Sequence, residues 1–142
     1  MTRFFDLDEA NETLRELQPV LVALRDQRAE LIRLRDRVLA TTPGDESAAG
    51  GSGSAAGAEA VENLRLLRMR MQGVIDQMQA GVVRIDELSV TLRDIESGLI
   101  DFPALVTGRQ VWLCWRLGEG DIAWWHELST GFEGRQPLSE LT

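Results

Sequence analysis

Two long segments of the chain each carry one apolar stripe, and these stripes limit the possible folds more than any other feature. Over residues 7–40, apolar side chains recur at steps of mostly three and four, at Ala10, Leu14, Leu17, Leu21, Leu24, Leu31, Leu34 and Val38. This spacing is typical of a helix with one buried face. Asp6 and Glu9 have the spacing of a capping box, so the helix is expected to begin near Leu7. Pro19 lacks a backbone N–H and predicts a kink or short break.

The second stripe covers residues 59–88, at Val61, Leu64, Leu67, Met71, Val74, Met78, Val82, Ile85 and Leu88. A helix of this length spans roughly 45 Å, which is too long for a compact domain of this size to surround. We therefore predict that the two helices pair as a long antiparallel coiled-coil hairpin. Residues 41–58 are rich in Gly, Ser and Ala, and this composition predicts a flexible linker between the helices.

The apolar pattern changes after residue 88. Residues 89–96 fit either a continuing helix or a strand. Further on, residues 110–117 and 121–128 are strand-like runs joined by a Gly-Glu-Gly turn. Residues 90–128 are therefore predicted to form a small antiparallel β-sheet. Residues 129–142 contain glycines and a proline that predict a C-terminal loop. The expected fold is α+β, a single domain over residues 1–142.

The predicted β-hairpin contains all four tryptophans, the only cysteine and the only histidine of the chain. If its loop is symmetric, Leu117 faces Ile122, and His126 lies opposite Leu113 on an apolar face. Cys114 would then lie on the other face, opposite Trp125. In this register His126 is interpreted as a hydrogen-bonded core residue.

An alternative interpretation makes His126 a general base or a metal ligand, because imidazole titrates near neutral pH and carboxylates can orient it. The candidate site residues are Asp101, Cys114, Arg116, Glu119, His126, Glu127 and Arg135. The chain has no repeated Cys or His spacing of the kind that marks zinc sites. We therefore predict no cofactor, with a divalent metal as the alternative.

Several of these residues lie in motifs that resemble a known family. They are Phe5 with Glu9-Ala10-Asn11, Gly98-Leu-Ile-Asp-Phe-Pro-Ala104, Leu113-Cys-Trp-Arg-Leu-Gly-Glu119, Trp125-His-Glu127, Gly131-Phe132 and Gly134-Arg-Gln-Pro-Leu138. Over nearly its whole length the chain resembles a bacterial family known as domain of unknown function family 2203. The family normally has Thr where Asp6 stands, and both residues can cap a helix. The resemblance implies that Asp101, Cys114, Arg116, Glu119, His126 and Arg135 belong to a shared motif.

Composition excludes several classes of function. The net charge is −8, which opposes nucleic-acid binding. All 15 cationic residues are Arg, so a Schiff-base lysine and a phosphate-loop lysine are both absent. One cysteine cannot form an intrachain disulfide, which favours the cytoplasm. No apolar run is long enough to cross a membrane, and no secretory signal is expected at the N-terminus.

Two functions remain. Each helix buries only one stripe, so further apolar surface is expected to meet another copy of the chain or a protein partner. This predicts a non-enzymatic interaction or scaffold protein that forms a homodimer with four helices. The alternative is a small-molecule or metal-binding protein, or an enzyme, with its site in the Trp-rich hairpin.

Overall fold

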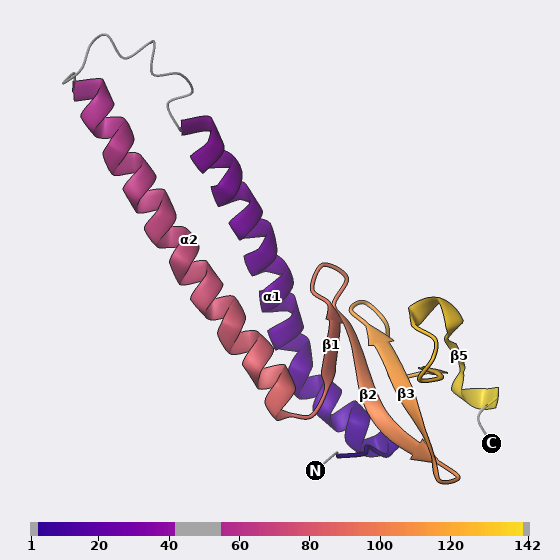
Figure 1. Ribbon diagram of the computed structural model, residues 1–142. Coiled ribbons are helices and arrows are strands. Elements are labelled where there is room, and N and C mark those ends of the chain that lie inside the picture. The colour runs from indigo at the N-terminus through magenta and orange to yellow at the C-terminus, as the bar shows by residue number, and fades with distance from the viewer. Residues whose placement is uncertain (1–2, 42–54, 141–142) are drawn as a thin grey trace. The chain divides into compact units, whose positions relative to one another are not determined.

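The computed structural model describes residues 3–41 and 55–140, and it has the predicted α+β fold. Two long antiparallel helices, α1 (Leu7–Thr41) and α2 (Ala55–Glu87), are followed by a five-stranded antiparallel sheet (Figure 1). The strands are β1 (Thr91–Asp94), β2 (Leu99–Val106), β3 (Arg109–Arg116), β4 (Trp124–His126) and β5 (Gln136–Pro137), and they lie in sequence order across the sheet. Within the described residues, neither helix has the length and apolar character needed to cross a membrane.

The start of α1 follows from its cap. The backbone N–H of Glu9 donates to Oδ1 of Asp6 at 2.7 Å, which satisfies one of the free N–H groups of the first turn. The helix runs through Pro19 without the predicted break, while the predicted kink stays a prediction. Leu17 and Leu21 on either side of the proline are fully buried. Their burial offsets a proline cost of about 3 kcal/mol.

The start of α2 corrects the predicted linker. Residues 55–58, expected in the linker, form the first turn of α2, because their alanines favour helix. Residues 42–54 of the predicted linker lie outside the described residues. At the other end, Ser89 has a positive φ of 65°, which stops the helix and redirects the chain into β1. Residues 91–94 are therefore strand, which settles the alternative between helix and strand.

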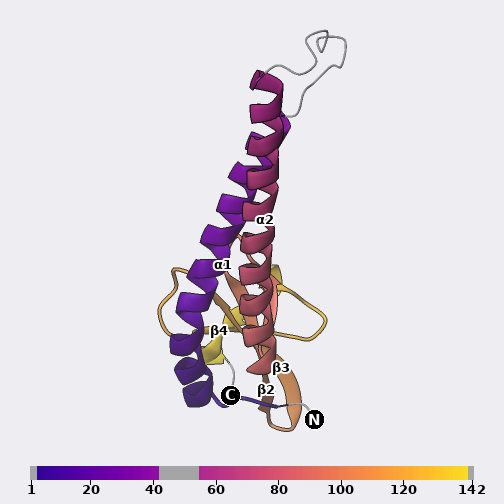
Figure 2. The same cartoon turned by 90° about the vertical axis from the view of Figure 1, so that its left-hand side faces the viewer.

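The chain divides into two compact units. One unit contains Met1–Asp26 and Gln79–Thr142, and the other contains Gln27–Met78. In the first unit the helices are joined by an ion pair between Arg84 and Glu16, and Gly81 lies against Leu24. In the second unit an ion pair of 3.1 Å joins Arg70 to Glu30, beside the buried Leu34, Leu64 and Leu67. Both units therefore contain the antiparallel pairing of the helices, which Figures 1 and 2 display.

One face of the sheet forms the core of the first unit together with the N-terminal segment. The ring of Phe5 meets Phe102 edge to face at a centroid distance of 5.2 Å, and the backbone N–H of Phe5 donates to the carbonyl of Pro103 at 2.8 Å. Ile100, Leu113 and Trp115 are buried and alternate with residues of the opposite face. The buried polar and ionisable side chains of the sheet therefore lie on its opposite face.

The pairing of β3 with β4 differs from the predicted register by one residue. Trp112 pairs with His126, and Cys114 pairs with Trp124. Residues 121–123 do not extend β4, because α1 holds the loop: the N–H of Ile122 donates to Oδ1 of Asn11 at 2.9 Å. Since side chains alternate along a strand, this one-residue change moves His126 from the predicted apolar face to the face of Cys114.

The segment predicted as a C-terminal loop also contains regular structure. Gln136–Pro137 forms β5 and pairs with β4, and the short 3₁₀ helices Phe132–Gly134 and Leu138–Glu140 lie on either side of it. This segment places Arg135 on the sheet face that carries Cys114 and His126. A loop without regular structure would not hold Arg135 in this position.

Candidate metal centre

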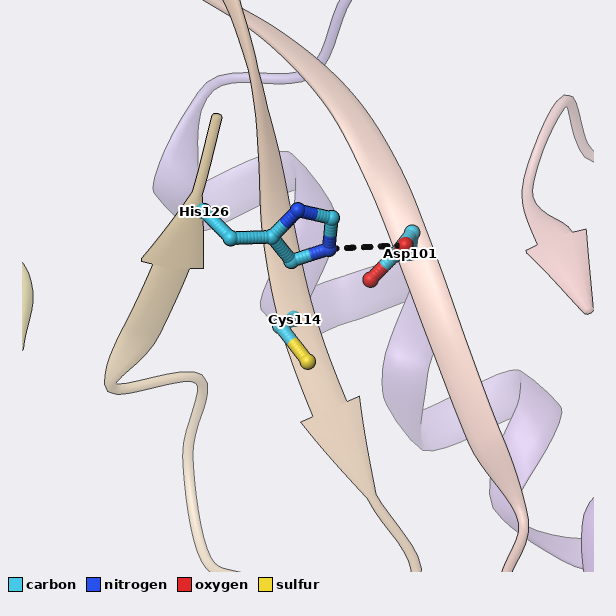
Figure 3. Close-up of side chains that lie close together, drawn as sticks. All are labelled: Asp101, Cys114 and His126. Atoms are coloured by element: carbon cyan, nitrogen blue, oxygen red, sulfur yellow. Dashed lines mark hydrogen bonds and ion pairs between the residues drawn. The ribbon is translucent and has the colours of Figure 1, made fainter. Parts of the chain in front are cut away.

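Three side chains from three neighbouring strands converge on one face of the sheet. Asp101 in β2 pairs directly with Cys114 in β3, and His126 in β4 pairs with Trp112, two residues from Cys114 on the same face. One ligand atom from each residue lies within 4.8 Å of the other two. The residues are 1%, 1% and 2% exposed respectively. Figure 3 shows the imidazole of His126 turned toward the carboxylate of Asp101, with Cys114 beside them on the neighbouring strand.

Both ring nitrogens of His126 have partners, and these partners assign the tautomer. Nδ1 lies 2.8 Å from the backbone carbonyl of Glu127, and a carbonyl only accepts, so Nδ1 carries a hydrogen and donates it. Nε2 lies 2.9 Å from Oδ2 of Asp101. One proton must therefore lie between Nε2 and that carboxylate. A metal ion can take the place of this proton.

Asp101 is only partly satisfied by its neighbours. Its Oδ2 accepts from Nε of Arg93 at 2.8 Å as well as bonding His126. Its Oδ1 is buried and has no hydrogen-bond partner among the described residues. A buried carboxylate oxygen without a partner costs on the order of 1–3 kcal/mol. Such an atom indicates a ligand that completes the site.

The thiol of Cys114 is protonated in the metal-free protein. Burial and, to a smaller extent, the negative charge of Asp101 raise its pKa to about 12, and Arg135 opposes both effects. A thiol in this state is a poor nucleophile, because only the thiolate attacks. A metal ion can displace the thiol proton and bind the sulfur as thiolate.

A cavity of about 330 Å³ opens beside the three residues. It is lined by Arg93, Leu99, Asp101, Cys114, His126, Leu128, Thr130, Gly131 and Phe132. An ion held by three protein ligands at its inner end would have room for a further ligand on the cavity side. This combination of three protein ligands and an open position is typical of catalytic zinc sites.

The other predicted site residues take supporting or separate positions. Arg135 forms a two-point ion pair with Glu119, at 2.7 and 3.1 Å, and its Cζ lies 4.5 Å from the Trp124 ring centroid. Burial alone would raise the pKa of Glu119, but bonds from Arg135 and from the Arg116 backbone N–H hold it below its ordinary value. The Arg116 side chain stacks on Phe132 at 5.0 Å.

Glu127 does not bring its carboxylate to the site. Its side chain pairs with Arg109, and only its backbone carbonyl contributes, through Nδ1 of His126. Arg93 is a site residue that the sequence analysis missed. Thr91 pairs with Asp101, and Arg93 lies in the bulge of β1 two residues further on. The alternation of Val90 and Leu92 with polar residues could have indicated Arg93, but only if residues 89–96 were predicted to form a strand.

Comparison with protein-family models finds one that covers most of the chain. The family described as "Uncharacterized conserved protein (DUF2203)" matches residues 3–138. Comparison with curated proteins finds no match, and comparison with solved structures finds none. The match includes all seven predicted site residues and confirms the resemblance seen in the sequence. The chain belongs to the DUF2203 family.

Proposed function

We propose that this DUF2203 protein binds one divalent metal ion, with zinc as the preferred ion, through Asp101, Cys114 and His126. The observation that carries the proposal is the convergence of three buried donors within 4.8 Å, on a cavity and with one oxygen of Asp101 unpartnered. A purely structural role for His126 accounts for its two hydrogen bonds. That role leaves Oδ1 of Asp101 without a partner, whereas an ion bound between the three donors would complete it.

The donor types favour zinc among the common metals. Thiolate, imidazole and carboxylate are all zinc ligands, whereas calcium and magnesium take oxygen ligands. Zinc–ligand bonds of about 2.0–2.3 Å in a tetrahedron place the donor atoms about 3.5 Å apart. Donors that already lie within 4.8 Å need only small side-chain rotations to reach that geometry.

The surroundings of His126 support the same assignment. Histidine ligands commonly donate their second ring N–H to a backbone carbonyl, which fixes the ring and raises its basicity. The bond from Nδ1 of His126 to the Glu127 carbonyl is of this kind and leaves Nε2 directed at the cluster. The cytoplasm, which the lone cysteine favours, would keep Cys114 reduced and able to bind metal.

Titration of the metal-free protein with Co²⁺ tests the proposal, because a cobalt–thiolate bond gives a charge-transfer absorption that oxygen and nitrogen ligands do not. We expect one ion per chain, this absorption in the wild type and its loss in Cys114→Ser. His126→Gln and Asp101→Asn should weaken binding at least about a hundredfold. Glu127→Gln is the matched control, since that carboxylate lies outside the cluster.

Circular dichroism of each variant shows whether it is folded. The charge-transfer absorption of the wild type tests the proposal even when a variant does not fold. Absence of Co²⁺ and Zn²⁺ binding by the wild type would overturn the proposal. Binding without the thiolate absorption, or equal binding by all three ligand variants, would overturn it as well.

A second proposed function is the predicted self-association of the chain as a homodimer. It is supported by an apolar surface hollow of about 660 Å³ on α2, lined by Val61, Leu64, Arg65, Arg68, Met69 and Gln72. Val61 is 66% exposed and Met69 is 57% exposed, an unusual exposure for large apolar side chains on one helix. Light scattering of the wild type and of Val61→Glu tests this. We expect a dimer that Val61→Glu dissociates, and a wild-type monomer at high concentration contradicts it.

A further inference from the structure

The cavity beside the proposed metal centre is lined by one cation and several apolar side chains. Among the described residues that line it, Asp101 is the only acidic one, and in the proposed centre its carboxylate is a metal ligand. Arg93 supplies the only cationic side chain of this described lining. A ligand entering this cavity therefore meets positive charge that no further carboxylate of the described lining neutralises.

Arg93 is held in place on two sides. Its Nε donates to Oδ2 of Asp101 at 2.8 Å, and its Cζ lies 4.9 Å from the ring centroid of Trp112. The bond to Asp101 uses Nε and not the two terminal nitrogens, which have no hydrogen bond within the described part of the chain. Since the side chain is 42% exposed and lines the cavity, those terminal groups can donate to an incoming ligand.

Charge in and around the cavity favours an anion. The carboxylate of Asp101 and the thiolate of Cys114 would neutralise a divalent ion, which leaves the charge of Arg93 uncompensated. Arg116 adds positive charge at the rim, where its Cζ lies 5.0 Å from the Phe132 ring centroid. Arg135 adds none, because Glu119 pairs with it.

The walls of the cavity indicate the rest of the ligand. Leu99, Leu128 and Phe132 give it apolar sides. Its volume of about 330 Å³ lies at the lower end of the range for small-molecule sites. The forked N–H groups of a guanidinium match the two oxygens of a carboxylate.

We infer that the cavity binds a small monocarboxylate with an apolar body, and this inference rests on the proposed metal centre. One carboxylate oxygen takes the open position of the ion, and the other accepts from the terminal nitrogens of Arg93. The apolar body lies against Leu99, Leu128 and Phe132. Arg93 is thus a ligand-binding residue of the site.

Benzoate is a suitable probe, and the full chain loaded with Co²⁺ reports its binding through the ligand-field absorption of the ion. We expect a saturable change with benzoate and none with the uncharged benzamide. Arg93→Gln should weaken benzoate at least tenfold while Co²⁺ binding changes only a few-fold, because glutamine can still donate to Asp101. Arg93→Lys should restore part of the affinity, and Arg109→Gln, whose guanidinium pairs with Glu127 away from the cavity, should match the wild type.

Three results with a normally loaded protein would overturn the inference alone. They are no spectral response to benzoate, an equal response to benzamide, and a benzoate affinity that Arg93→Gln does not change. Tighter binding of inorganic phosphate than of benzoate would overturn the carboxylate class. Failure of Co²⁺ to bind at all is a separate result, which overturns the metal centre and this inference together.

Discussion

His126 shows how much a single residue depends on its strand register. In the predicted register it faces Leu113 and the apolar core, and in the observed register it shares a face with Cys114. The ring is buried in either case, but only the second arrangement gives Nε2 a carboxylate partner. The chemistry of this residue therefore follows from a backbone pairing that residue type alone does not determine.

The thiol of Cys114 should be unreactive in the folded, metal-free protein. Burial raises its pKa from 9.0 to about 12, so at pH 8 the thiolate is scarce as well as inaccessible. We expect a disulfide thiol reagent to react at least about a hundredfold more slowly than with the urea-unfolded chain. Reaction rates with and without urea measure this, and comparable rates would contradict the buried position of the sulfur.

The same shift has a consequence for stability at high pH. The folded pKa is raised, so the folded chain keeps a proton that the unfolded chain loses. The contribution of the thiol to stability is therefore complete below pH 9 and is lost as the pH rises toward 12. Cys114→Ala should show a smaller decline of unfolding free energy over this range than the wild type.

The ion pair between Glu119 and Arg135 should contribute stability that is lost at acid pH. The pKa of Glu119 is lowered, so its contribution is present at neutral pH and is lost as the pH falls through the folded pKa. Glu119→Gln should lower the unfolding free energy by about 1–2 kcal/mol at pH 7, because both partners are mostly buried. Chemical denaturation at pH 7 and pH 3 measures it, and the difference from wild type should shrink at pH 3. A deficit that is equal at both values would contradict the pairing.

At the scale of elements, the helices could be predicted and the sheet only in part. Each helical stripe repeats over many turns, so one misplaced residue such as Pro19 does not hide it. The strands β4 and β5 have 3 and 2 residues, too few for a pattern. Their positions depend on distant contacts such as Asn11 with Ile122, which lie 111 residues apart in the sequence. For this reason seven site residues were predicted and only Asp101, Cys114 and His126 converge on the centre.

Two glycines of α2 form a matched pair that tests the helix packing. A Cβ at Gly73 would meet nothing within 4 Å, so Gly73→Ala should gain about 0.5–1 kcal/mol of helix propensity. A Cβ at Gly81 would lie 3.1 Å from Cδ2 of Leu24, so crowding offsets the same gain. Chemical denaturation should rank Gly73→Ala clearly above Gly81→Ala. Equal stabilities of the two variants would contradict the close approach of the helices at Leu24.

At the scale of the whole molecule, the two proposed functions fall in different compact units. The metal ligands and Arg93 belong to the unit with Gln79–Thr142, whereas the apolar hollow belongs to Gln27–Met78. Membership of the DUF2203 family extends across both units. The whole chain has a net charge of −8, whereas the proposed ligand cavity is lined by the cationic Arg93. The local charge at the cavity therefore differs from the net charge of the molecule.

This division predicts that the two functions can be lost separately. Val61→Glu should abolish self-association and leave metal affinity within about threefold of wild type, since Val61 and the metal ligands belong to different compact units. His126→Gln should remove metal binding and leave the oligomeric state unchanged. Light scattering and Co²⁺ titration of both variants measure this. A large loss of metal affinity in Val61→Glu would show instead that the units depend on each other.

X-ray absorption of the one-to-one zinc complex tests the metal centre most directly, because it reports the ligand atoms themselves. The proposed centre predicts one sulfur ligand at about 2.3 Å, with nitrogen and oxygen ligands at about 2.0–2.2 Å. Loss of the sulfur ligand in Cys114→Ser should accompany weaker binding. A wild-type spectrum with oxygen ligands only, or a protein that retains no zinc after dialysis, would contradict the account.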